Sequence, residues 1–68
     1  MMTVDEVRAA LAKIRAQAEY GDNEAAHGTQ DELFTDVLTA IKEGAEKPQA
    51  LAGAALEVMD LDFDRWYA

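Results

Sequence analysis

His27 and Asp31 are the two residues whose types and spacing come nearest to catalytic chemistry. Residues four apart share one face of a helix, so the Asp31 carboxylate would orient the His27 imidazole, as a general base or a metal-bound histidine requires. The chain has no serine, no cysteine and no second histidine to supply a nucleophile or complete a metal site. We therefore predict a protein that is not an enzyme, with no catalytic residue, metal or cofactor. His27 is interpreted as a residue that packs or caps at the start of a central helix.

Asp60, Asp62 and Asp64 have the spacing of the first three ligands of a calcium loop. Such a loop also needs a glycine at its sixth position, which is Arg65 in this chain. We expect these aspartates to be solvated charges between buried apolar residues.

Phe63, Trp66 and Tyr67 form a bulky C-terminal cluster with two interpretations. In the first, Phe63 and Trp66 fold back as core anchors, each burying about 150–250 Å². In the second, part of the cluster is exposed and docks a partner, because Trp and Tyr dominate interface hot spots. Both interpretations hold if the Trp66 side chain lies in the core and the Tyr67 side chain lies on the surface.

Fourteen acidic residues against six basic ones give the 68-residue chain a net charge of −8. Such a charge repels polyphosphates and anionic membranes, so we expect no direct nucleic-acid binding. The N-terminus lacks the pattern of a signal peptide, and no apolar run approaches the length of a membrane span. We expect a soluble, intracellular protein. The charge suits solubility, a basic protein partner or imitation of a phosphate backbone.

The length predicts a single domain over residues 1–68, near the lower limit for an unaided core. Without cysteines, neither disulfides nor a thiolate-bound zinc can stabilise it. Stability must come from close helix packing or from burial of more surface in an oligomer.

The first predicted helix covers residues 3–20. Thr3 and Glu6 match a capping box, and Gly21 is a natural left-handed stop. Apolar residues at spacings of three and four define one core face, namely Val4, Val7, Leu11, Ile14 and Ala18.

The central helix is predicted over residues 29–44. Thr29 and Glu32 match a second capping box, so we place its start at Gly28 or Thr29. Residues 21–28 are interpreted as a turn and loop, in which residues 24–27 can form a short helical turn that Gly28 interrupts. Gly44 is the expected stop. A broad apolar stripe is expected to face the core: Leu33, Phe34, Val37, Leu38 and Ile41.

The third helix is predicted over residues 48–59, with Pro48 at its first position. Its expected core face comprises Leu51, Ala52, Ala55, Leu56 and Met59, with Val58 beside them. Glycine inside a helix costs about 1 kcal/mol relative to alanine, and a close helix–helix contact at Gly53 is expected to offset that cost. The predicted fold is all-α, a small three-helix bundle with a short C-terminal helical turn or tail folded back on it.

Several elements resemble a group of small acidic proteins from actinobacteria and their bacteriophages that has no assigned activity. The resemblance covers roughly residues 20 to 68. This chain differs from the group at Gly28, where the group often has serine, and at Asp64, where it often has proline. The matching elements are Glu24–His27, Asp31, Val37–Leu38, Ala40–Ile41, Gly44, Leu51–Ala52, Ala55–Leu56 and the ending Asp62-Phe63-x-Arg65-Trp66-Tyr67-Ala68. The resemblance implies a bacterial or phage cytoplasmic protein and lends no catalytic residues.

The same resemblance couples His27 and Asp31 to the C-terminal residues. We hypothesise that the tail crosses the start of the central helix, with Arg65 near Asp31 or Glu32 and Trp66 packed close to His27. The expected function is a non-enzymatic interaction protein that binds a host or partner protein through an acidic helical surface. Two alternatives are an acidic decoy for a DNA-binding protein and a small homo-oligomeric structural component.

Overall fold

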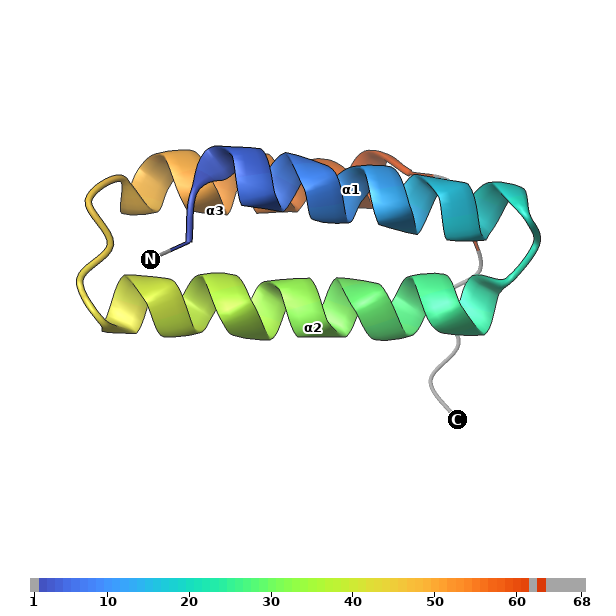
Figure 1. Ribbon diagram of the computed structural model, residues 1–68, viewed down its shortest axis with the longest axis horizontal. Coiled ribbons are helices and arrows are strands. Elements are labelled where there is room, and N and C mark those ends of the chain that lie inside the picture. Colours follow the sequence, from blue (N-terminus) through green and yellow to red (C-terminus); the bar gives the residue numbers. More distant parts are fainter. Residues whose placement is uncertain (1, 62, 64–68) are drawn as a thin grey trace.

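The computed structural model describes residues 2–61 and 63. Within them the chain forms three α-helices, α1 (Val4–Glu19), α2 (Asn23–Lys42) and α3 (Pro48–Leu56), followed by a 3₁₀ turn, η1 (Glu57–Asp60). In Figure 1, α1 and α3 run in the same direction and α2 runs antiparallel to both. Every pair of helices is in contact, most extensively α1 with α2. The predicted all-α three-helix bundle is confirmed.

The predicted ends of α1 are confirmed. The Thr3 hydroxyl accepts a hydrogen bond from the Glu6 amide at 3.2 Å, and the Glu6 carboxylate accepts one from the Thr3 amide at 3.1 Å. Gly21 ends the helix with φ +79°, and its amide donates to the Ala18 carbonyl at 3.0 Å. Glycine adopts this left-handed conformation without the steric cost that a Cβ brings.

The predicted start of α2 is wrong. The helix begins at Asn23, because the Asp22 carboxylate caps it by accepting a hydrogen bond from the Ala25 amide at 3.2 Å. It continues through Gly28, so Thr29 lies inside the helix rather than at its start. A helical glycine costs about 1 kcal/mol, too little to break a well-capped helix. The predicted stop is confirmed, since Gly44 follows the helix with φ +91°.

Pro48 opens α3 as predicted, but the α-helix ends at Leu56 and the chain continues as η1. The expected close contact at Gly53 is absent. Gly53 is exposed, and a Cβ placed on it would meet no atom within 4 Å. Its helical cost is therefore not offset by packing.

The core lies where the three helices meet, and its largest fully buried side chains are Ile14, Leu51, Val7 and Val58. The remaining buried apolar residues are Ala26, Leu33, Val37, Ala45, Ala54 and Ala55. Because so many of them are alanines, the core is built from small side chains at short distances. Phe63 and Leu61 are half-buried and pack against it from beyond η1.

Two of the predicted core faces are partly wrong. Leu38, Leu56 and Met59 are 66%, 62% and 54% exposed, whereas Val58 is fully buried. After Leu56 the chain changes from α-helical to 3₁₀ geometry, in which residues i and i+3 eclipse each other. Met59 therefore points in the same direction as the exposed Leu56, and Val58 points into the core. On α2 the apolar stripe is wider than the surface that α1 and α3 cover.

Candidate interaction surface

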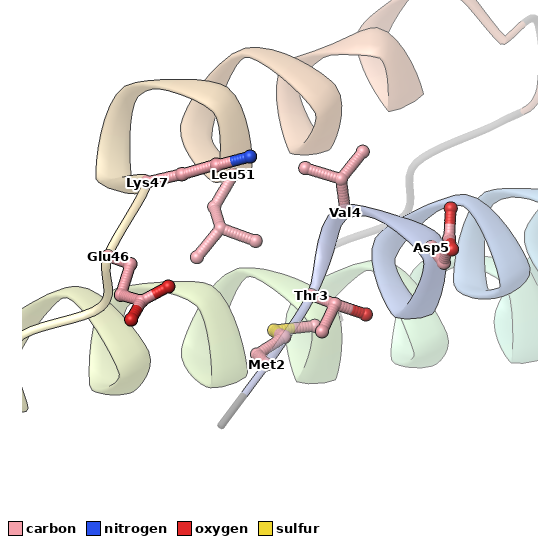
Figure 2. A pocket seen from close by; sticks show the side chains of 7 residues that line it. All are labelled: Met2, Thr3, Val4, Asp5, Glu46, Lys47 and Leu51. Atoms are coloured by element: carbon pink, nitrogen blue, oxygen red, sulfur yellow. The ribbon is translucent and has the colours of Figure 1, made fainter.

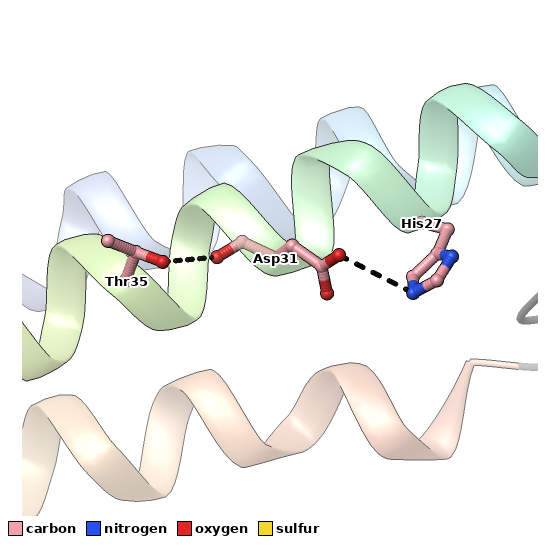
Figure 3. A network of polar contacts seen from close by, with 3 residues as sticks. All are labelled: His27, Asp31 and Thr35. Atoms are coloured by element: carbon pink, nitrogen blue, oxygen red, sulfur yellow. Dashed lines mark hydrogen bonds and ion pairs between the residues drawn. The ribbon is translucent and has the colours of Figure 1, made fainter. Parts of the chain in front are cut away.

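His27 and Asp31 lie one turn apart on α2, as their spacing predicts. His27 Nε2 is 3.5 Å from Asp31 Oδ2, and the Thr35 hydroxyl donates to the Asp31 carbonyl at 3.0 Å. Figure 3 shows these side chains on the side of α2 that faces α3 and η1. The His27 side chain is 12% exposed and that of Asp31 is 63% exposed. A pair with one solvated member contributes little to stability, about 0–1 kcal/mol.

The surroundings of His27 do not add further catalytic groups. In residues 2–61 and 63, no cluster of three histidine, cysteine, aspartate or glutamate residues is placed to hold a metal ion. His27 lines none of the surface hollows described below. The geometry of the pair allows the Asp31 carboxylate to orient the His27 imidazole.

Of the predicted C-terminal cluster, only Phe63 belongs to the described part of the chain. It is half-buried against the core, as expected for an anchor that folds back. Arg65, Trp66 and Tyr67 lie outside the described residues. Their hypothesised contacts with His27, Asp31 or Glu32 therefore stay a prediction.

A mixed hollow of about 420 Å³ lies where the start of α1 meets the start of α3. Figure 2 shows its seven lining side chains, which come from the start of α1, the α2–α3 connection and α3: Met2, Thr3, Val4, Asp5, Glu46, Lys47 and Leu51. Its charges have both signs, and Thr3 is already engaged in the α1 cap. The hollow therefore lacks a set of side chains directed at one kind of ligand.

Four of the fourteen acidic residues line the surface between α1 and α2, where Lys13 also lies. Two hollows there, of about 500 and 210 Å³, share Met2, Glu6 and Asp36. Glu43 lines the first and Glu32 the second. We call Glu6, Glu32, Asp36 and Glu43 the acidic side. Asp31 does not belong to the acidic side, since it lies on the α3-facing side of α2 (Figure 3).

An apolar groove of about 270 Å³ lies between α2 and α3. Its lining contains no polar side chain and consists of Phe34, Val37, Leu38, Ile41, Ala52, Ala55 and Leu56. Leu38 and Leu56 are its most exposed members, at 66% and 62%. We call this set the apolar groove.

Sequence reasoning missed this groove because it assigned all seven residues to the core. The only sequence signal was width: Leu33 to Ile41 spread over more of the helix than one neighbour covers. On a bundle of three short helices, such an excess of apolar surface faces solvent.

No model of a known protein family matches the chain, and comparison with the curated proteins and with the solved structures finds no match. No helix in the described part of the chain is long and apolar enough to cross a membrane. The functional argument therefore depends on the surface alone.

Proposed function

We propose that this chain is a non-enzymatic protein-interaction module, a small acidic protein of an actinobacterium or its phage, which contacts a partner protein through the apolar groove. The observation that supports the proposal is the solvent-facing position of Leu38 and Leu56 in a lining without polar side chains. Continuous exposed apolar patches on soluble domains mark protein interaction sites. Leucines held on two packed helices also offer a partner a surface that needs little ordering on binding.

A second candidate is an acidic decoy that occupies the basic groove of a DNA-binding protein. The acidic side supports it, since four carboxylates surround two adjoining hollows. Two kinds of binding surface thus lie on opposite sides of α2, and they predict different partners.

Site-specific photo-crosslinking tests the first proposal. A benzophenone amino acid replaces Leu38 in the apolar groove or, as the matched control, Asp36 on the acidic side of the same helix. We expect adducts with a protein from position 38 and fewer from position 36. If position 38 forms no adduct above that control, the groove is not an interaction surface and the proposal fails.

Salt separates the two candidates. Binding through the groove buries apolar surface and should change little between about 50 and 500 mM salt, because screening acts on charges. A decoy that replaces phosphates should lose affinity steeply over the same range. Adducts that come from position 36 and disappear at high salt would favour the decoy.

A further inference from the structure

The apolar groove extends along about two turns of α2. Its residues come from Phe34–Ile41 of α2 and Ala52–Leu56 of α3, and Met59 of η1 is also 54% exposed. The chain itself is 35 Å long, and the 20 residues of α2 span about 30 Å of that length. A partner that lies along α2 would therefore cover the exposed leucines together.

The acidic side lies away from this groove, on the other side of α2. Glu32, Asp36 and Glu43 line hollows on the α1 side of α2, while the groove lining has no charged residue. A helix is about 10 Å thick with its side chains, which exceeds the Debye length of about 8 Å at physiological ionic strength. The carboxylates of the acidic side therefore oppose a second copy at the groove only weakly.

Four residues on the exposed edge of α2 beside the groove are spaced symmetrically along the helix, so the intervals between them are the same when counted from either end. Asp31, Thr35, Leu38 and Lys42 are separated by four, three and four residues and so share one face of the helix. The carboxylate stands at one end of this stripe and the ammonium at the other. Two identical helices laid antiparallel would place each Asp31 opposite a lysine and each Leu38 opposite a threonine.

We propose that the apolar groove is covered by a second copy of this chain, in a two-fold symmetric dimer in which the two α2 helices lie antiparallel. Leu38 and Leu56 lie in the interface, and Asp31 faces Lys42 of the partner subunit on each side of the axis. This inference rests on the proposed function, because it names the partner of the same surface. The acidic sides of both copies stay on the outside of the dimer.

A dimer interface of standard size would take a modest share of the exposed surface of this chain. A standard interface buries about 800 Å² per partner, roughly one sixth of the 4738 Å² that the chain exposes. A core built so largely of alanine is small, and burial in an oligomer is one of the few ways in which a domain of this length gains stability. A second copy supplies that burial without a disulfide or a metal.

Sedimentation equilibrium of the full chain, at concentrations up to about 1 mM, the weak end of specific association, tests the dimer. We expect a reversible monomer–dimer equilibrium that Leu38→Glu weakens by about 100-fold or more, as is typical of a central hot spot. Leu38 is 66% exposed, so the monomer should keep its helical circular dichroism. A monomer at every concentration, or a dimer that survives this substitution, overturns the proposal.

Charge reversal tests the antiparallel arrangement. Asp31→Lys should weaken the dimer by roughly ten-fold, because two exposed ion pairs become two like-charge pairs. Adding Lys42→Glu should restore it. Residues 31 and 42 are about 16 Å apart along one helix, so such a rescue arises only between copies. Asp36→Lys is the control, since it changes the net charge equally on the acidic side and should not weaken the dimer.

The outcomes distinguish this inference from the proposed function. A dimer lost with Leu38→Glu but not rescued by the double substitution overturns the antiparallel arrangement. A strict monomer that still forms adducts with another protein from position 38 overturns the dimer and leaves the interaction module in place. If position 38 forms adducts only with residues of its own chain, another segment of the same chain covers the groove. That result would overturn both the dimer and the interaction module.

Discussion

The Asp22 carboxylate accepts a hydrogen bond from the Ala25 amide at 3.2 Å, and this contact sets the start of α2. Because the cap lies at Asp22 and not at Thr29, the helix includes the turn that carries His27. Both His27 and Asp31 are therefore helical. Two residues four apart can meet only when the turn between them is formed.

The two capping interpretations predict opposite effects of two substitutions. Asp22→Ala should lower the free energy of unfolding by about 1 kcal/mol, the usual value for loss of an N-cap. Thr29→Ala should have little effect or stabilise slightly, because Thr29 is inside the helix and alanine is the better helix former. Urea denaturation followed by circular dichroism measures both. A larger loss with Thr29→Ala would return the helix start to the position that the sequence suggested.

Gly28 offers an independent test of the same region. It is helical, exposed and without neighbours within 4 Å of a placed Cβ. Gly28→Ala should therefore stabilise the domain by about 0.5–1 kcal/mol. Gly21→Ala should destabilise it by about as much, because Gly21 has φ +79°. Thermal unfolding of the two variants gives the comparison. Destabilisation by Gly28→Ala would mean that a break in the helix exists at that residue.

Local signals in the sequence predicted most of the fold. The Thr3–Glu6 box, the Gly21 and Gly44 stops and Pro48 each act through their own neighbours, and each lies where it was expected. The start of α2 was mispredicted because two capping patterns, Asp22 and Thr29, compete within seven residues. The earlier one forms in the structure, where the Asp22 side chain caps the helix and Ala26 in its first turns is fully buried in the core.

The candidate surface was harder to predict, because periodicity shows that residues share a face but not whether anything covers it. Leu33 and Leu38 belong to the same apolar stripe, yet one is 2% and the other 66% exposed. Coverage depends on where α3 lies and on the change to 3₁₀ winding after Leu56. Both are properties of the folded chain as a whole.

The same substitution, leucine to alanine, at Leu51 and at Leu56 tests which side of α3 faces the core. Leu51 is 2% exposed and Leu56 is 62% exposed. Leu51→Ala should cost about 2–5 kcal/mol through lost burial and a residual cavity, which approaches the whole stability of so small a domain. Leu56→Ala should leave the unfolding of the dilute monomer nearly unchanged. Chemical denaturation at low micromolar concentration measures both. Equal losses would place Leu56 in the core.

The C-terminal hypothesis is tested at Trp66, which lies outside the described residues. Phe63 is half-buried against the core, so the chain is still in contact with the bundle three residues earlier. If Trp66 packs near His27, Trp66→Ala should destabilise the domain by about 3–5 kcal/mol, as for other buried large aromatic residues. Thermal unfolding measures the loss.

Tyr67→Ala is the matched control for Trp66→Ala. The adjacent residue is also a large aromatic. If Trp66 lies inside and Tyr67 outside, removal of the Tyr67 side chain should change the melting temperature much less. Quenching of Trp66 fluorescence by iodide gives a second readout, because a packed indole is shielded from an ion in solution. An unchanged melting temperature for Trp66→Ala, together with full quenching, would contradict the folded-back tail. Partner binding lost with Tyr67→Ala alone would instead place the second aromatic in an interface.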